Sequence, residues 1–327
     1  MDPANPQTES GVVDLSVIIV SWNVADLLVD CLDSVLFNSV VMSRQPDQQP
    51  RTEVIVVDSA SSDSTVERVR QRFPGVTLLP QAENVGFTRG NNIGLQAARG
   101  RYLLLLNPDT LVLGDALQVM VNHMDANPDV GMLGPYTLNT DGTPQSTRRR
   151  FPTLATAFFE STWLQPFAPQ ALLDRYYMRD LPDLGTCDVD WVQGSALMVR
   201  REVYEQIGGL DEGFVMYSEE LDWCKRAKDA DWRVVFLGAA QIIHHGGKSS
   251  DQVTAFKHIQ FQRSKLRYFR KYHGSGAVLA LRTFLLMNYA WQLGLESVKS
   301  LLGHKRDMRR ERIRAYWQVL RSGLRAT

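Results

Sequence analysis

This sequence has few of the residues and motifs that would assign it to several common protein classes. Its 327 residues include only three cysteines, Cys31, Cys187 and Cys224, which are far apart and have no C-x-x-C spacing. Neither a disulfide framework nor a cysteine metal site is indicated, and we interpret the cysteines as reduced thiols of a cytosolic protein. The 36 basic and 36 acidic residues cancel, so no overall field directs the chain to nucleic acid.

Nucleotide-binding fingerprints and membrane signals are also missing. Neither G-x-G-x-x-G nor a complete G-x-x-x-x-G-K-[ST] occurs, which counts against a dehydrogenase or a P-loop NTPase. In the apolar stretch 276–302 the longest uncharged run is Thr283–Leu295, shorter than the roughly 20 residues that a spanning helix needs. Residues 1–12 have no basic or apolar signal-peptide region, so we expect a disordered leader there.

Strand and helix patterns alternate along the first part of the chain. Four continuous apolar runs are typical of strands buried on both faces: 15–20, 53–57, 76–79 and 102–106. Helical patterns lie between them, at 25–37, 65–73 and 91–98. This alternation predicts an α/β fold with βαβ units and a parallel sheet. Loops and short helices are expected at 140–190, and further strands at 196–199 and 233–236.

The C-terminal region has a different character. After Gly247 apolar residues recur at helical spacing, and the tail from His304 carries eight basic residues against two acidic ones, a net charge of +6. An amphipathic helix beside a basic tail predicts contact with an anionic membrane surface. The alternative is a helix packed on the domain or on a second subunit of a homodimer. We therefore expect a catalytic domain at 13–250 and a helical extension at 251–327.

The segment Tyr217–Lys225, YSEELDWCK, concentrates three carboxylates beside aromatic residues. Neighbouring negative charges and an apolar environment both raise the pKa of a carboxyl group. Such a carboxylate is suited to act as a general base toward a hydroxyl group. Glu219, Glu220 and Asp222 are therefore catalytic candidates. The competing interpretation is an ordinary helix start, where the helix dipole favours acidic residues.

Polar clusters follow three of the predicted strands, at 21–23, 58–63 and 107–109. Ligands bind at the carboxyl edge of an open parallel sheet, so Asn23 and Asp58 are candidate ligand-binding residues. Pro108 restricts the backbone before Asp109, which leaves a buried strand and suits a hard divalent cation. A turn or helix cap would explain a single aspartate equally well.

Two further segments suit a phosphorylated ligand. The stretch 84–92, NVGFTRGNN, is a glycine-punctuated loop that enters a helix and resembles a phosphate or nucleotide cradle. After the last predicted strand, 244–249 read HHGGKS. His244 could complete a metal sphere with Asp109, while Lys248 and Ser249 hold a diphosphate. A structural histidine pair is the alternative.

In this order the motifs resemble glycosyltransferase family 2, and within it the rhamnosyltransferase-like branch. The resemblance covers about residues 15–249 and rests on VIIVSWN, VVDSASSDST, NVGFTRGNN, LLLLNPDT, GSALMVRREVYEQIGGLDEGF, SEELDWCKR and HHGGKS. It implies the GT-A fold, which is Rossmann-like with a mostly parallel central sheet flanked by helices. Here a C-terminal amphipathic helical extension would follow that domain.

The resemblance also implies a role for each matching residue. Glu220 would be the catalytic base, supported by Glu219 and Asp222, and Asp109 would bind Mg²⁺ or Mn²⁺ together with His244. Asp58 would contact the nucleotide base. The remaining donor- and acceptor-site candidates are Asn23, Asn84, Gly86, Gly90, Asn91, Trp191, Gln193, Gly194 and Lys248.

The implied reaction is an inverting, metal-dependent sugar transfer in cell-envelope glycan synthesis. The reaction that the resemblance favours is transfer of L-rhamnose from dTDP-rhamnose to a lipid-linked or polysaccharide acceptor at the inner face of the cell membrane. Another sugar, such as galactofuranose, glucose or mannose, is an alternative. A non-catalytic nucleotide-sugar-binding scaffold is another, because Ser59 replaces the branch's usual asparagine and Asn107 replaces the first aspartate of D-x-D.

Overall fold

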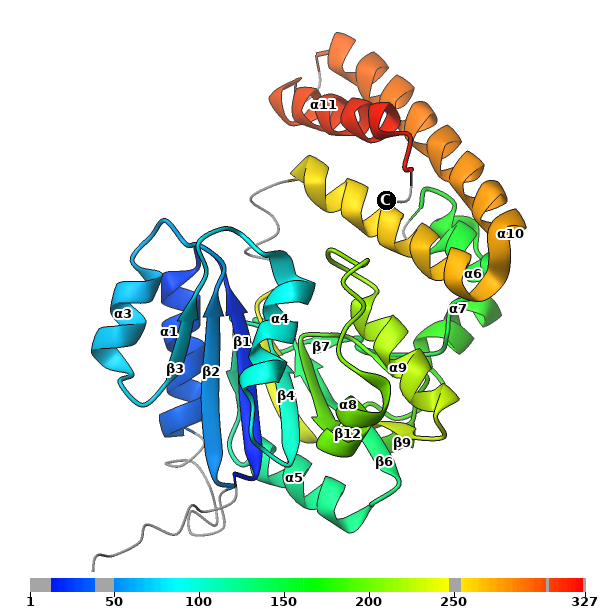
Figure 1. Cartoon of the computed structure of the whole chain (residues 1–327). Coiled ribbons are helices and arrows are strands. Elements are labelled where there is room, and N and C mark those ends of the chain that lie inside the picture. Colours follow the sequence, from blue (N-terminus) through cyan, green and yellow to red (C-terminus); the bar gives the residue numbers. More distant parts are fainter. Residues whose placement is uncertain (1–12, 39–49, 161, 247–253, 304–305, 326–327) are drawn as a thin grey trace, which may run out of the picture.

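The structure is a computed structural model and describes residues 13–38, 50–160, 162–246, 254–303 and 306–325. A ten-stranded sheet has the order β3-β2-β1-β4-β11-β6-β12-β5, with β7 paired to β6 and β9 paired to β12. Two long C-terminal helices lie beyond the end of the sheet toward which β1 and β2 point (Figure 1). The predicted leader at 1–12 lies outside the described residues.

The first half of the sheet is parallel, as the alternating pattern predicted. Its strands are β1 (Leu15–Ser21), β2 (Thr52–Asp58), β3 (Thr77–Pro80) and β4 (Tyr102–Leu106). Its helices are α1 (Ala25–Asp33), continued by the π-turn Ser34–Asn38, α3 (Thr65–Arg72) and α4 (Gly86–Ala97). All residues of β1 and β4 are buried, because helices cover both faces of these strands.

The second half of the sheet is mixed. β11 (Ala196–Arg200) runs antiparallel between β4 and β6 (Val130–Leu138). β12 (Arg233–His244) is parallel to β6 and antiparallel to β5 (Thr110–Val112). Six of the ten strands, β1, β2, β3, β4, β6 and β12, therefore run in the same direction. The predicted α/β class with a mostly parallel sheet is confirmed.

Two elements of this half escape the sequence pattern. β6 was not predicted, because glycine and proline interrupt its sequence VGMLGPYTL. Close packing explains its glycines: a Cβ at Gly131 would lie 2.7 Å from the Cβ of Trp232, and one at Gly134 would lie 2.7 Å from that of Val192. β12 was predicted at 233–236 but continues to His244, past an irregularity between Leu237 and Gln241.

The region between β6 and β11 consists of short elements, of which the helices were predicted and the four short strands were not. The elements are β7 (Pro144–Gln145), β8 (Arg148–Arg149), α6 (Leu154–Phe159), the 3₁₀ turn Gln165–Phe167, α7 (Gln170–Tyr177), β9 (Thr186–Asp188) and β10 (Trp191–Val192). The other helices of the sheet domain are α5 (Ala116–Ala126), α8 (Arg201–Ile207) and α9 (Glu219–Asp229). β8 and β10 form a separate two-stranded ribbon.

The sheet separates two apolar layers. Val17 and Ile19 of β1 pack in one layer with residues of α1 and α5, while Ile18 and Val20 pack in the other with residues of α4, α8 and α9. This alternation follows from the two-residue period of a strand. A third cluster joins Phe214 to α6, α10 and α11, so the C-terminal helices have a core of their own against the sheet domain.

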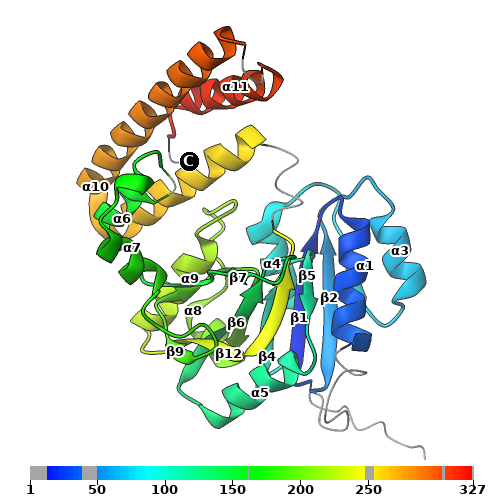
Figure 2. The same cartoon turned by 180° about the vertical axis from the view of Figure 1, so that it is seen from behind.

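The extension consists of α10 (Thr254–Leu301) and α11 (Arg306–Ser322). Gly274 interrupts α10 with φ 82° and ψ 174°, a conformation that glycine adopts at little cost. The chain turns there, so that the second part of α10 runs away from the sheet with α11 beside it (Figures 1 and 2). Buried contacts thus account for part of the predicted amphipathic pattern.

Candidate active site

Asn23 connects the loops that follow β1 and β2. Its Oδ1 accepts hydrogen bonds from the backbone N–H of Ser62 at 2.8 Å and from the Ser62 hydroxyl at 3.3 Å. Its own N–H donates to the Ser61 hydroxyl at 2.9 Å. Asn23 has φ 52°, a left-handed conformation that asparagine tolerates better than most residues. Asn23 therefore holds the two loops together at the carboxyl edge of the sheet, where ligand binding was predicted.

Asp58 ends β2 as a buried carboxylate. Its Oδ2 accepts from the Ser61 N–H at 3.0 Å, whereas its Oδ1 is buried with no hydrogen-bond partner among the described residues. An unsatisfied buried acceptor is costly in a folded protein. A donor from a bound ligand would satisfy it, which fits the predicted contact with a nucleotide base.

Ser59 holds the glycine-rich segment in place. Its hydroxyl donates to Asn84 Oδ1 at 3.0 Å and accepts from the Val85 N–H at 2.9 Å. Asn84 Oδ1 also accepts from the N–H of Gly86 at 2.9 Å, and Gly86 has φ +76°. Ser59, which replaces the usual asparagine of the branch, therefore has a structural role in this loop.

Gly90 and Asn91 lie within α4 rather than in a loop, because this helix starts at Gly86 and not near 91 as expected. A Cβ at Gly90 would lie 2.8 Å from Val20 Cγ1. The buried Asn91 side chain donates to the Phe87 carbonyl at 3.0 Å. Packing of the helix on β1 explains Gly90, and Asn91 bonds to the backbone of its own helix. The predicted ligand role of both residues stays a prediction.

Asp109 and His244 come together at the ends of β4 and β12. β5 pairs Thr110 with His244, and the Asp109 Oδ1 lies 3.3 Å from His244 Nε2. The other imidazole nitrogen, Nδ1, lies 2.8 Å from Gln145 Oε1, which holds the ring in this orientation. The extension of β12 beyond its predicted end therefore produces the predicted pair.

The residues around this pair fit a divalent cation only in part. Within the described ranges, no three or more His, Cys, Asp or Glu side chains surround a common point. Asn107 Oδ1 is buried with no hydrogen-bond partner among the residues that the structure describes, and its Nδ2 lies 3.3 Å from His244 Nε2. One carboxylate, one imidazole and one amide oxygen suit Mg²⁺ or Mn²⁺ when phosphate oxygens complete the sphere. Lys248, the predicted diphosphate contact, lies outside the described residues.

Glu219 and Glu220 begin α9 directly after two left-handed residues. Tyr217 has φ 69° and Ser218 has φ 63°, conformations that cost energy in residues other than glycine. The Glu220 Oε1 accepts from the Gly194 N–H at 3.4 Å. Its other oxygen, Oε2, is buried with no hydrogen-bond partner in the described part of the chain. The segment is thus a helix start and also a place where a carboxylate is held with one oxygen available.

Burial raises the pKa of both carboxyl groups. For Glu220 desolvation is the main cause, partly offset by backbone N–H groups such as that of Gly194. For Glu219 desolvation is again the main cause, and the neighbouring charge of Glu220 raises the pKa further. This matches the expected physical effect of the acidic cluster. A carboxylate with a raised pKa is a stronger base than an exposed glutamate.

Replacing Glu219 with glutamine should stabilise the protein at pH 8. Because the folded-state pKa of Glu219 is raised, folding favours its protonated form, and stability is lost as the pH rises above the unfolded-state value. Glutamine resembles the protonated form, so we expect a melting temperature about 2 °C or more higher at pH 8 and little difference at pH 4. Thermal denaturation of Glu202→Gln, an exposed first-turn glutamate of α8, is the control. A lower melting temperature for Glu219→Gln at pH 8 would contradict the assignment.

Asp222 lies two positions after Glu220 in α9, but its contacts point elsewhere. It is fully buried and accepts from Arg226 at 2.9 Å, the Tyr272 hydroxyl at 2.8 Å and Lys271 at 2.7 Å. Tyr272 and Lys271 belong to α10. The structure therefore connects Asp222 to the helical extension and does not place it in the cavity beside Glu220.

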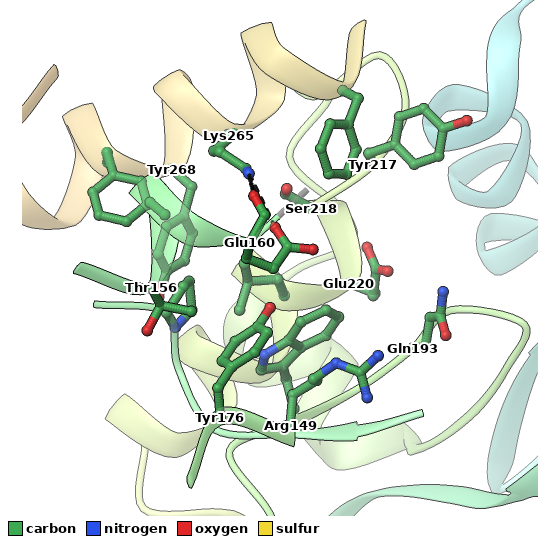
Figure 3. A pocket seen from close by; sticks show the side chains of 16 residues that line it. Arg149, Thr156, Glu160, Tyr176, Gln193, Tyr217, Ser218, Glu220, Lys265 and Tyr268 are labelled. Carbon is green, nitrogen blue, oxygen red and sulfur yellow. Dashed lines mark hydrogen bonds and ion pairs between the residues drawn. The ribbon is translucent and has the colours of Figure 1, made fainter. Parts of the chain in front are cut away.

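A cavity lies beside Glu220 between the sheet domain and α10 (Figure 3). The predicted residues Trp191 and Gln193 line it. Several further polar or aromatic lining residues were not predicted as site residues, among them Arg149, Glu160, Tyr176 and Lys265. No sequence pattern distinguishes these four, because four separate elements supply them: β8, the end of α6, α7 and α10. Only a run of three arginines at 148–150 hinted at one.

The two groups of candidates form one site. The Asn107 N–H donates to the Ser195 carbonyl at 2.9 Å, and Ser195 follows Gly194, whose N–H donates to Glu220. A single loop between β10 and β11 thus touches both the 107–109 segment and the acidic helix. The predicted metal-binding and catalytic residues are held on either side of that loop.

Comparison with known proteins agrees with this architecture. The family model described as glycosyl transferase family 2 matches residues 16–208. The N-acetylglucosaminyl-diphospho-decaprenol L-rhamnosyltransferase of Mycobacterium tuberculosis is 29% identical over 208 residues, covering 60% of this chain and 67% of that protein. The rhamnosyltransferase WbbL of Escherichia coli is 24% identical over 201 residues, covering 59% and 72%.

Among solved structures, the mannosyltransferase PcManGT from Pyrobaculum calidifontis in complex with GDP-Man and Mn²⁺ superposes with a TM-score of 0.52. The identity is 17%, and the match covers 95% of this chain and 84% of that one, so it shows a shared fold. The family model spans more than half of the chain. The protein therefore belongs to glycosyltransferase family 2, is a glycosyltransferase, and resembles the rhamnosyltransferases of that family.

Proposed function

We propose that the protein is an inverting, metal-dependent glycosyltransferase that moves a sugar from a nucleotide donor to a lipid-linked acceptor in cell-envelope glycan synthesis. One observation carries the proposal. The buried carboxylate of Glu220 lies beside a cavity, has one oxygen with no hydrogen-bond partner in the described ranges, and is one loop away from the Asp109–His244 pair. dTDP-rhamnose is the favoured donor, because the two bacterial relatives described above are rhamnosyltransferases.

Each part of the site has a separate task in this proposal. Asp58 Oδ1 accepts a hydrogen bond from the nucleotide base, and the 84–86 segment positions the nucleotide. Asp109 and His244, with Asn107, would hold Mg²⁺ or Mn²⁺, which when bound neutralises charge on the donor diphosphate. Glu220 takes the proton from the acceptor hydroxyl. A single base on the side opposite the leaving group corresponds to inversion at the anomeric carbon.

A donor panel tests the proposed function. Thermal stabilisation and slow donor hydrolysis should be measured with dTDP-rhamnose and with UDP- and GDP-sugars, each with and without Mg²⁺ or Mn²⁺. Metal-dependent stabilisation by dTDP-rhamnose alone is the expected result. Stabilisation by another nucleotide sugar would replace rhamnose but keep the mechanism. Stabilisation by a donor without hydrolysis or transfer would favour the non-catalytic nucleotide-sugar-binding scaffold, and no response to any donor would contradict the proposed function.

The extension offers a surface for the proposed membrane contact. Five exposed apolar residues recur at helical spacing along the second part of α10 and directly after its end: Met287, Trp291, Leu295, Val298 and Leu302. Six arginines of the neighbouring α11 segment are exposed, namely Arg306, Arg310, Arg312, Arg314, Arg321 and Arg325. Apolar side chains beside arginines suit the headgroup region of an anionic bilayer. No helix in the described ranges has the length and apolarity to cross a bilayer.

Replacing Trp291 with glutamate should weaken binding to phosphatidylglycerol vesicles about tenfold or more, because it removes a large apolar contact and adds a repelled charge. The control is Trp317→Glu, since Trp317 on α11 is 54% exposed and Trp291 is 57% exposed. Vesicle co-sedimentation measures both variants. Equal loss in the two variants, or no binding by the unmodified protein, would contradict a docking surface on α10.

A further inference from the structure

Three consecutive arginines of the β8 ribbon have three different environments. Arg148 is buried and donates to the carbonyls of Pro182 at 2.7 Å and Leu181 at 2.5 Å. Arg150 lies 3.6 Å from the carboxylate of Asp190. Arg149 lines the cavity beside Glu220. The run is therefore not a uniform solvated face, and only its middle residue reaches the candidate active site.

The charge of Arg149 has no acidic counterion within 4 Å in the part of the chain that the structure describes. Its guanidinium donates to the Ser146 hydroxyl at 2.7 Å and to the Arg148 carbonyl at 2.9 Å. It also lies over the rings of Tyr177 at 4.5 Å and Tyr176 at 5.9 Å. Arginine remains charged in proteins, so the ribbon and these rings hold a cation in the cavity wall with no described carboxylate in ion-pair contact, although Glu160 lies near enough to act on it electrostatically.

The acids near Arg149 have other roles. Glu160, on the same cavity wall, is paired with Lys265 at 3.0 Å. Glu220 accepts from Gly194 and is the proposed base. Arg149 is only partly exposed, and taking a cation partly out of water is costly unless an anion accompanies it. A planar guanidinium is also well suited to the oxygens of a phosphate group.

The position of Arg149 relative to the base is fixed by the β8–β10 ribbon. Trp191 pairs with Arg149, and the Gln193 N–H donates to the Thr147 carbonyl at 2.9 Å. In Figure 3 the side chains of Arg149, Gln193 and Glu220 face the same space. In an inverting transfer the acceptor lies on the side of the base and the donor's leaving group on the other. An anion bound by Arg149 would therefore belong to the acceptor.

The cavity wall continues toward the apolar surface of the extension. Thr156 and Glu160 line the cavity, and Trp163 follows three residues after Glu160 with an exposed side chain. The ring of Trp163 lies 6.5 Å from that of Trp291 on α10. An acceptor could thus place a hydroxyl at Glu220, an anionic group at Arg149 and an apolar chain near Trp163 and Trp291.

We propose that Arg149 binds the diphosphate of a lipid-linked acceptor, whose apolar chain leaves the cavity along Trp163 toward α10. This inference rests on the proposed function and adds the chemical class of the acceptor to it. Arg149 is a binding residue for the acceptor and has no role in holding the donor.

Direct binding tests this assignment. Farnesyl diphosphate, inorganic pyrophosphate and farnesol should be titrated calorimetrically into protein saturated with the nucleoside diphosphate of the donor found in the panel, so that the donor site is occupied. The unmodified protein should bind farnesyl diphosphate more tightly than either of the other two. Arg149→Ala should weaken farnesyl diphosphate binding about tenfold or more, as loss of a charge-assisted contact predicts, and leave farnesol binding unchanged.

Arg150→Ala is the matched control, because it removes the same charge one residue away outside the cavity and should bind all probes normally. Arg149→Lys keeps the charge and should recover part of the affinity. Pyrophosphate binding as tight as farnesyl diphosphate would identify a general anion site and overturn the lipid-linked acceptor. Weaker binding of the donor nucleotide by Arg149→Ala would assign Arg149 to the donor and overturn the proposal. Absence of any donor response in the unmodified protein would instead contradict the proposed function.

Discussion

Glu220→Gln should lower the rate of sugar transfer about 10²–10⁴-fold, the usual contribution of a general base. Glutamine keeps the size of the side chain, and its carbonyl oxygen can still accept the hydrogen bond from Gly194, but it cannot take a proton. Donor binding should not change, because Asp58 and Asp109 are not among the residues that line the cavity beside Glu220. Steady-state transfer kinetics and donor-induced thermal stabilisation separate the two effects.

The pH dependence gives a second test of the same residue. Burial raises the pKa of Glu220, and the base acts only when deprotonated. Transfer should therefore decline as the pH falls through a value above that of an ordinary glutamate, while donor binding remains. Glu202→Gln, on the surface of α8, should leave the profile unchanged. A Glu220→Gln enzyme with full activity would remove Glu220 from its proposed role.

Asp109→Asn should abolish the metal-dependent part of donor binding and lower kcat/KM about 100-fold or more, because a bound cation supplies several kcal/mol of charge stabilisation. Among the three proposed metal ligands, Asp109, His244 and Asn107, Asp109 is the carboxylate. Neutralising it leaves a histidine and amides, which bind hard cations weakly. Titration of Mn²⁺ in the presence of the donor nucleotide measures the effect.

Asp141→Asn provides the control, because it removes the same charge. Asp141 is an exposed aspartate between β6 and β7 that bonds only to Thr143 in the described structure. His244→Gln should weaken the metal response less than Asp109→Asn, because it removes a neutral ligand. Donor binding by Asp109→Asn that still depends on Mn²⁺ as in the unmodified protein would place the cation elsewhere.

The sequence predicted the parallel half of the sheet well, and the reason is local. The strands 15–21, 52–58 and 102–106 each contain a continuous apolar run, which is the pattern of a strand covered on both faces. β6 was missed for the opposite reason: Gly131 and Gly134 suggest a turn, whereas they are required by the close approach of Trp232 and Val192. Contacts between distant residues override the local preference there.

Among the candidate site residues, the sequence located the carboxylates but could not separate their roles. Glu220 and Asp222 lie two positions apart in one acidic motif, yet Glu220 borders a cavity and Asp222 bonds to Lys271 and Tyr272 of α10. The partners of Asp222 are about 50 residues away in the chain. No spacing rule within the motif contains that information.

The sequence by itself determined the family, the α/β class and the residues at the strand ends, because motif identity and hydrophobic period are local properties of the chain. The tertiary structure alone decided that β12 extends to bring His244 to Asp109, that Arg149 rather than Arg148 or Arg150 reaches the cavity, and that α10 closes one side of that cavity. These outcomes depend on strand pairing and on packing between segments far apart in sequence. Such contacts form only when the whole chain is folded.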